Sequence, residues 1–125
     1  MVRRVRVACA LMAVAALGTA GMTAVAVAAK TTTKTVTVKG PAAYSSKSVT
    51  APAGKMTLKM KHGTAVPHNI AIRGKGLKKP AIGKVVGKGK TSVATATLPP
   101  GGYVFYCTVP GHEQAGMKGT LKVTR

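Results

Sequence analysis

Residues 106–117 read Tyr-Cys-Thr-Val-Pro-Gly-His-Glu-Gln-Ala-Gly-Met, and this stretch decides how the whole chain is interpreted. A thiol at Cys107, an imidazole at His112 and a thioether at Met117 follow one another with four residues between neighbours. A second imidazole, His68, stands upstream in a Pro-His-Asn sequence. One cysteine, two histidines and a weak methionine form the donor set that copper uses in electron-transfer sites. The sequence therefore predicts that these four side chains bind one metal ion.

Simpler interpretations exist for each side chain. Taken alone, Cys107 reads as a buried structural thiol, His68 as a hydrogen-bonded core histidine and Met117 as core packing. Gln114 is an alternative axial donor, because some copper sites use Gln. Zinc also accepts a Cys-His-His set, but a methionine ligand favours the softer copper ion. His62 fits no ligand position and is expected at the surface.

The N-terminal segment has the composition of a secretory signal peptide. Three arginines precede an apolar run and a series of small residues that ends in an A-x-A cleavage pattern. We predict that residues 1–29 are a signal peptide and residues 30–125 the copper-binding domain. The protein is then exported to the periplasm, the cell envelope or the extracellular space. An uncleaved membrane anchor and twin-arginine export are the alternatives.

The predicted mature chain is one small domain with a single thiol. Removing 29 of 125 residues leaves 96, which is enough for one core. Cys9 lies in the predicted signal, so Cys107 is the only cysteine left and cannot form an internal disulfide. A lone thiol in an oxidising compartment is a liability, and a bound metal would protect it.

Acidic side chains are almost absent. The chain has 20 Lys and Arg against one acid, Glu113; without the three arginines of the predicted signal, the formal charge is +16. This composition excludes paired-carboxylate glycosidases, Ser-His-Asp triads and carboxylate-rich calcium or magnesium sites. Glycine motifs that bind phosphate are also missing. We therefore expect a protein that is not an enzyme.

The mature chain shows the period-two pattern of half-buried strands. Apolar residues recur at every second position, or β-branched residues cluster, at 36–38, 57–61, 68–72, 91–98, 103–107 and 120–124. Gly and Pro clusters separate these segments. No stretch has a helical stripe, so we expect an all-β sandwich or barrel.

At these residues the chain resembles the cupredoxins, the blue copper proteins. The Pro67-His68-Asn69 sequence, the strand of residues 102–107 and the C-x4-H-x4-M loop match, and the resemblance covers nearly all of residues 35–124. The loop spacing is similar to that of azurin and auracyanin, and the strand before it to that of plastocyanin. The resemblance implies an all-β, Greek-key β-sandwich of seven to eight strands with one copper ion at one end.

The resemblance also assigns roles to single residues. It implies four metal ligands, namely His68, Cys107, His112 and Met117. It aligns Asn69 with the asparagine that tethers the ligand loop by hydrogen bonds. His112 would be the ligand whose ring edge reaches solvent, the usual electron exit, and Tyr106 matches the tyrosine of a second route. Plant plastocyanins surround that tyrosine with acids, which are almost absent here, so a docking surface on this chain must have the opposite sign.

Residues 73–90 combine seven basic side chains with five glycines. The simplest interpretation is a solvated, flexible connection between strands. Its charge would also steer the protein towards an anionic partner: a redox protein with an acidic docking face, or an anionic membrane or cell-wall surface. Nucleic acid is disfavoured, because stacking aromatics are few and the chain is predicted to be exported. We expect a monomer.

The main hypothesis is an exported blue copper protein that carries one electron through a mononuclear Cys-His-His-Met site. One alternative is a copper storage or delivery protein with the same ligands. Another is a basic cell-surface binding protein. We do not expect catalysis on a metal-bound substrate, because four protein donors leave no open position.

Overall fold

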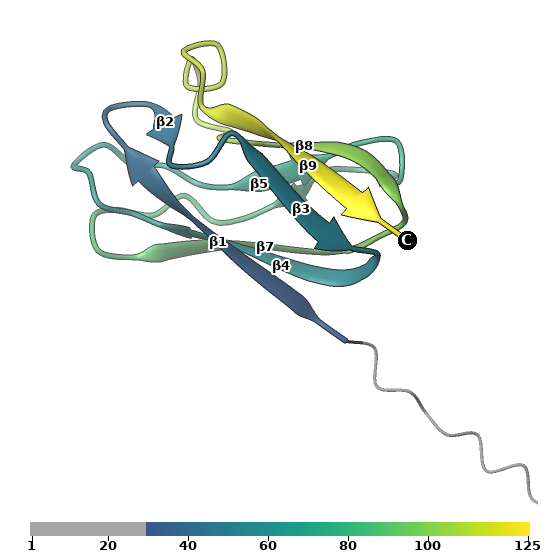
Figure 1. Ribbon diagram of the computed structural model, residues 1–125. Helices are drawn as coiled ribbons and strands as arrows, with labels where there is room; N and C mark the ends of the chain where they lie inside the picture. Colours follow the sequence, from purple (N-terminus) through teal and green to yellow (C-terminus); the bar gives the residue numbers. More distant parts are fainter. Residues whose placement is uncertain (1–29) are drawn as a thin grey trace, which may run out of the picture.

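The computed structural model describes residues 30–125, which form two β-sheets that enclose one core (Figure 1). The four-stranded sheet has the order β2-β1-β4-β7, with strands β2 (Ala43–Tyr44), β1 (Thr32–Lys39), β4 (Gly54–Lys61) and β7 (Thr91–Leu98). The five-stranded sheet has the order β3-β9-β8-β5-β6, with strands β3 (Ser48–Pro52), β9 (Lys118–Thr124), β8 (Gly101–Tyr106), β5 (Ala71–Arg73) and β6 (Ala81–Ile82). The predicted all-β sandwich is confirmed.

Each sheet combines parallel and antiparallel pairs. β1 runs parallel to β4 and β3 parallel to β9, whereas β4–β7, β8–β9 and β5–β8 are antiparallel. In sequence order the chain moves from β2 in one sheet to β3 in the other, and then back to β4. Each sheet therefore contains strands from the N-terminal and the C-terminal part of the domain, and the chain connects the two sheets several times.

The structure divides the described residues into nine strands, whereas the resemblance implied seven to eight. Seven strands have three or more residues, and β2 and β6 have two each. β3 lies at residues 48–52, where the sequence showed no strand pattern. The extra elements are short pieces at sheet edges and leave the sandwich architecture as predicted.

Side-chain alternation along the strands builds the core. In β4, Met56, Leu58 and Met60 are buried while Lys55 and Lys59 are exposed, as the period-two pattern predicted. Phe105 of β8 is fully buried and packs against the Tyr44 ring, with 5.4 Å between ring centroids. Burial of this apolar surface supplies the main driving force for folding.

No helix occurs among residues 30–125, so this part of the chain holds no helical segment that could cross a membrane. The predicted signal peptide, residues 1–29, lies outside the described residues. Its cleavage, and the anchor that is the alternative, remain predictions.

Candidate metal centre

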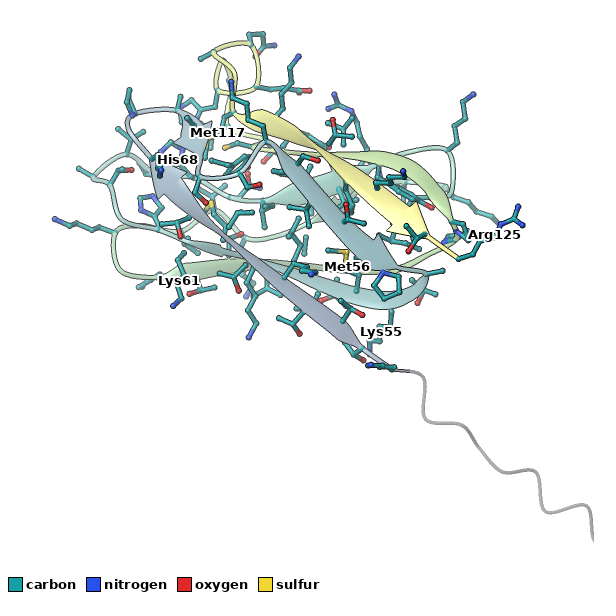
Figure 2. The ribbon with its side chains drawn as sticks, in the orientation of Figure 1. Lys55, Met56, Lys61, His68, Met117 and Arg125 are labelled. Carbon is teal, nitrogen blue, oxygen red and sulfur yellow. The ribbon has the colours of Figure 1, made fainter. Side chains whose placement is uncertain are left out.

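The four predicted ligands lie at one end of the sandwich. His68 precedes β5 and forms an isolated bridge with Val86: its N–H donates to the Val86 carbonyl at 3.2 Å and its carbonyl accepts from Val86 at 2.8 Å. Cys107 directly follows β8, His112 lies in the loop from β8 to β9, and Met117 directly precedes β9. Figure 2 shows His68 and Met117 at the end opposite Lys55 and Arg125.

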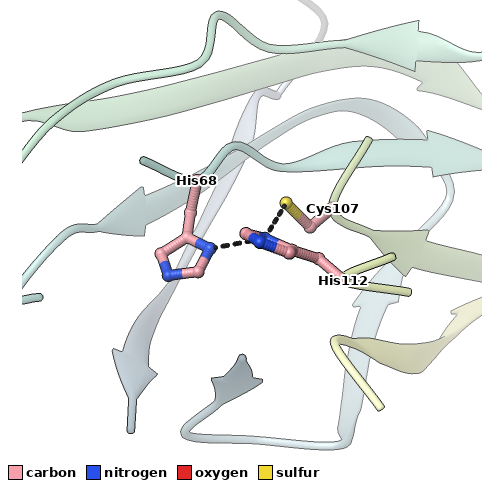
Figure 3. A group of neighbouring side chains, drawn as sticks. All are labelled: His68, Cys107 and His112. Atoms are coloured by element: carbon pink, nitrogen blue, oxygen red, sulfur yellow. Dashed lines mark hydrogen bonds between the residues drawn. The ribbon is translucent and has the colours of Figure 1, made fainter. Parts of the chain in front are cut away.

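Three donor atoms converge at this end (Figure 3). The Nδ1 atoms of His68 and His112 are 3.0 Å apart, and the Cys107 Sγ is 3.6 Å from the same His112 nitrogen. All three donor atoms lie within 4.8 Å of one another. His68 and Cys107 are buried and His112 is partly exposed. The cluster therefore has one side open towards solvent, at the imidazole of His112.

Met117 is fixed beside these donors by its backbone. The Cys107 N–H donates to the Met117 carbonyl at 3.1 Å, and the Met117 N–H donates to the His112 carbonyl at 3.0 Å. The Met117 side chain is fully buried, whereas Gln114 is exposed. Burial favours Met117 over Gln114 as the fourth donor.

The turn between Cys107 and Met117 depends on two glycines with positive φ. Gly111 has φ of 83° and Gly116 has φ of 106°, a region that costs other residues energy because Cβ crowds the backbone. The His112 N–H donates to the Val109 carbonyl at 3.1 Å, which tightens the turn. The loop thereby folds His112 back over the end of β8.

The donor set fits a copper ion. Bonds of about 2.0–2.3 Å from one ion to imidazole nitrogen and thiolate sulfur separate neighbouring donors by about 3–4 Å. The 3.0 and 3.6 Å separations fall in this range, and the third, between His68 and Cys107, is no longer than 4.8 Å. Ligation also requires an unprotonated imidazole nitrogen. The pKa of His68 is lowered, mainly by burial and to a smaller extent by the nearby imidazoles of His112 and His62, which favours the neutral form of its ring.

Asn69 connects the two ligand-bearing segments. Its Nδ2 donates to the Thr108 hydroxyl at 2.8 Å and to the Gly83 carbonyl at 2.9 Å, and its Oδ1 accepts from the Thr108 N–H at 2.7 Å. Tyr44 adds a fourth bond, donating from its hydroxyl to the Asn69 carbonyl at 2.8 Å. The residue after His68 and the residue after Cys107 are thus held directly against each other.

The expected surface position of His62 is wrong. Its ring is buried and lies 5.1 Å from the His68 ring, between centroids. The Nε2–H of His62 donates to the Val66 carbonyl at 2.6 Å, and Nδ1 accepts from the Thr64 N–H at 3.2 Å, so both ring nitrogens have a hydrogen-bond partner. The signal was present in the sequence: His62 continues the inward-facing series of Met56, Leu58 and Met60 one step beyond β4.

The segment of residues 73–90 is more ordered than the predicted flexible connection. It contains β6 and is tied to the sandwich by hydrogen bonds from Gly83 to the Ile70 carbonyl at 2.8 Å and from Val86 to His68. Arg73, at its start, forms an ion pair with Glu113, and its guanidinium carbon lies 4.3 Å from the Tyr106 ring centroid. Sequence reasoning missed this contact, because nothing local relates Arg73 to a residue forty positions away.

Comparison with known proteins places the chain in a family. The family of copper binding proteins described as the plastocyanin/azurin family matches residues 28–124. The chain belongs to this family. The membership confirms the resemblance to cupredoxins and confirms copper as the cofactor.

The proteins similar to this chain include auracyanins. Auracyanin-B of Chloroflexus aurantiacus is 61% identical over 33 residues, which is 26% of this chain and only 14% of that protein's length. Reduced auracyanin from the photosynthetic bacterium Roseiflexus castenholzii has a similar structure, with a TM-score of 0.65 and 33% sequence identity. The match covers 78% of this chain and 99% of the auracyanin chain. Azurin iso-2 of Methylomonas sp. strain J shares the fold, with a TM-score of 0.62 and 22% identity. The match covers 75% of this chain and 98% of the azurin chain.

Proposed function

We propose that this cupredoxin is a one-electron carrier with one copper ion held by His68, Cys107, His112 and Met117. The convergence of two imidazole nitrogens and one thiol within 4.8 Å carries the proposal. Copper supplies the Cu(II)/Cu(I) couple. The protein would supply the Cys107 sulfur and the His68 and His112 imidazoles as donors, with the buried Met117 thioether as a weaker fourth donor.

The rigidity of the site supports electron transfer over copper release. Hydrogen bonds between Asn69 and Thr108, and between the backbones of Cys107 and Met117, restrain all ligand-bearing segments. A site whose ligands move little between two charge states has a small reorganisation barrier. With four protein donors around one ion, no position is left for a substrate, so we propose no enzymatic activity.

We propose His112 as the electron exit. Its imidazole is partly exposed, whereas Cys107 and His68 are buried. Tyr106, the other candidate, is buried, and the Arg73 guanidinium packs over its ring. A cation on a ring disfavours removal of an electron from it, which directs transfer to His112.

The charge of the domain indicates the partner. Glu113 is the only acid in the chain and is already paired with Arg73, so the remaining basic residues face no compensating side-chain charge. We propose a redox partner with an acidic docking face, and export of the mature, monomeric domain by the predicted signal peptide. An anionic membrane or cell-wall surface is the alternative ligand for the same charge.

Stopped-flow mixing separates a carrier from a copper-delivery protein. The reduced, copper-loaded protein is mixed with an oxidised small-molecule acceptor and, separately, with a strong Cu(I) chelator. A carrier transfers its electron within the mixing experiment and retains copper in the chelator for much longer. Rapid loss of copper with slow electron transfer would support delivery instead. Failure to bind copper at all would support the basic surface-binding alternative.

A further inference from the structure

Arg73 contacts the residues that flank the segment from Cys107 to His112, which carries two of the proposed ligands. Its guanidinium donates to the Glu113 carboxylate, and Glu113 directly follows His112. The same guanidinium lies over the ring of Tyr106, which directly precedes Cys107. Arg73 itself ends β5, the strand that begins three residues after His68. One side chain thereby joins the three chain segments that supply His68, Cys107 and His112.

The contact is selective. Glu113 is the only carboxylate side chain in a chain with 20 basic residues, and Arg73–Glu113 is the only side-chain ion pair within residues 30–125. Both side chains are partly buried, with 42% of the Arg73 and 25% of the Glu113 side chain exposed. Arginine suits this position because its planar group can stack on an aromatic ring while donating to a carboxylate, which a lysine ammonium does less well.

We propose that Arg73 is a positioning residue for the metal centre, through a clamp formed by Arg73, Glu113 and Tyr106. This inference rests on the proposed function and extends it to a residue outside the ligand set. Asn69 ties the segment after His68 to Thr108 at the start of the ligand loop. The clamp ties the far part of the loop, next to His112, to β5 and β8. The ligand loop is thus held at two points, and His112 lies between them.

The first test uses the apo-protein and does not depend on copper. Amide hydrogen exchange of residues 108–116 is compared in wild type, Arg73→Gln, Glu113→Gln and Lys75→Gln. Lys75 is exposed and lies in the turn after Arg73, so its variant removes one charge without touching Glu113. Loss of a partly exposed ion pair predicts exchange up to about fivefold faster in the loop for the first two variants. Lys75→Gln and the amides of β4 and β7 serve as unchanged references.

The double variant Arg73→Gln/Glu113→Gln sharpens this test. If the two residues act through one contact, the double variant exchanges no faster than either single variant. Loop exchange in Arg73→Gln and Glu113→Gln equal to that of wild type overturns the clamp. Equal acceleration in Lys75→Gln also overturns it, because the effect is then one of overall charge.

The second test measures copper. Loss of a residue that orients a ligand typically weakens metal binding by about tenfold or more. We expect this loss in Cu(II) affinity, by chelator competition, together with a shifted thiolate-to-copper band, for Arg73→Gln and not for Lys75→Gln. If Arg73→Gln accelerates amide exchange in the loop but keeps the wild-type copper affinity and spectrum, the positioning role is overturned and Arg73 is only a structural residue. If wild type itself binds no copper, the proposed function fails and the positioning role with it, whereas the exchange experiment still decides the clamp.

Discussion

The Nδ1 atoms of His68 and His112 lie 3.0 Å apart, although the two residues are 44 positions apart in the sequence. His68 reaches this point from the chain that enters β5, and His112 from the loop that leaves β8. At this distance one nitrogen can donate a hydrogen bond to the other, or both can bind the same ion. The surrounding hydrogen bonds hold the two backbones in place.

Replacing Asn69 by Ala should destabilise the apo-protein by about 3 kcal/mol, because the buried Gly83 carbonyl and the Thr108 N–H lose their partner. Thr108→Val is the matched control: it removes only the hydroxyl that accepts from Asn69 and should cost about 1 kcal/mol. Urea unfolding measures both. Equal losses would mean that the Asn69 side chain acts mainly through that one hydroxyl.

The stability of the apo-protein should fall as the pH drops below 6.5, the ordinary pKa of histidine. Burial, with the neighbouring imidazoles of His112 and His62, lowers the pKa of His68 in the folded state. Below 6.5 the unfolded chain therefore binds a proton that folded His68 does not, and each pH unit lost costs at most about 1.4 kcal/mol. Above 6.5 both states are neutral and this contribution is constant.

The variant His68→Gln isolates that effect. Urea unfolding of both apo-proteins at about pH 7 and at about pH 5 gives two differences in free energy of unfolding. The wild type should lose more stability than the variant over this interval. The same loss in both proteins would show that His68 is not the group responsible.

Gly111→Ala should destabilise the protein by about 1 kcal/mol, because φ at this position is 83° and an added Cβ is strained there. Gly87→Ala is the control, since neither position has an atom within 4 Å of the new Cβ and only Gly111 has positive φ. Thermal unfolding of the two variants measures the difference. An equal change would mean that the loop relaxes without cost.

Tyr106→Phe should leave the rate of electron transfer to a soluble acceptor within about twofold of wild type, because Arg73 already covers this ring. Stopped-flow oxidation of the reduced protein measures the rate. The variant retains the ring and removes only the hydroxyl, so its fold should be unchanged. A large decrease would show that electrons leave through Tyr106 and would contradict an exit at His112.

The main strands and the candidate site could be predicted because their signals are local. β4 and β9 alternate buried and exposed side chains at every second residue, and Cys107, His112 and Met117 stand at fixed spacing in one loop. The position of His68 required the neighbouring Pro and Asn as well. Local pattern was sufficient wherever one strand face is buried and the other is exposed.

The missed features depend on distant partners. β3 has only Ala51 fully buried and is held by parallel pairing with β9, which the local sequence does not encode. β2 and β6 are two-residue pairings set by β1 and β5. The contact of Arg73 with Glu113 spans forty positions and exists only once both sheet and loop have formed.

Titration of the purified domain with Cu(II), followed by absorption and EPR spectroscopy, tests the central claim most directly. The account predicts an intense thiolate-to-copper band that saturates at one copper per chain and is absent from Cys107→Ser. A wild type without this band, or a Cys107→Ser variant that retains it, would contradict the proposed copper site.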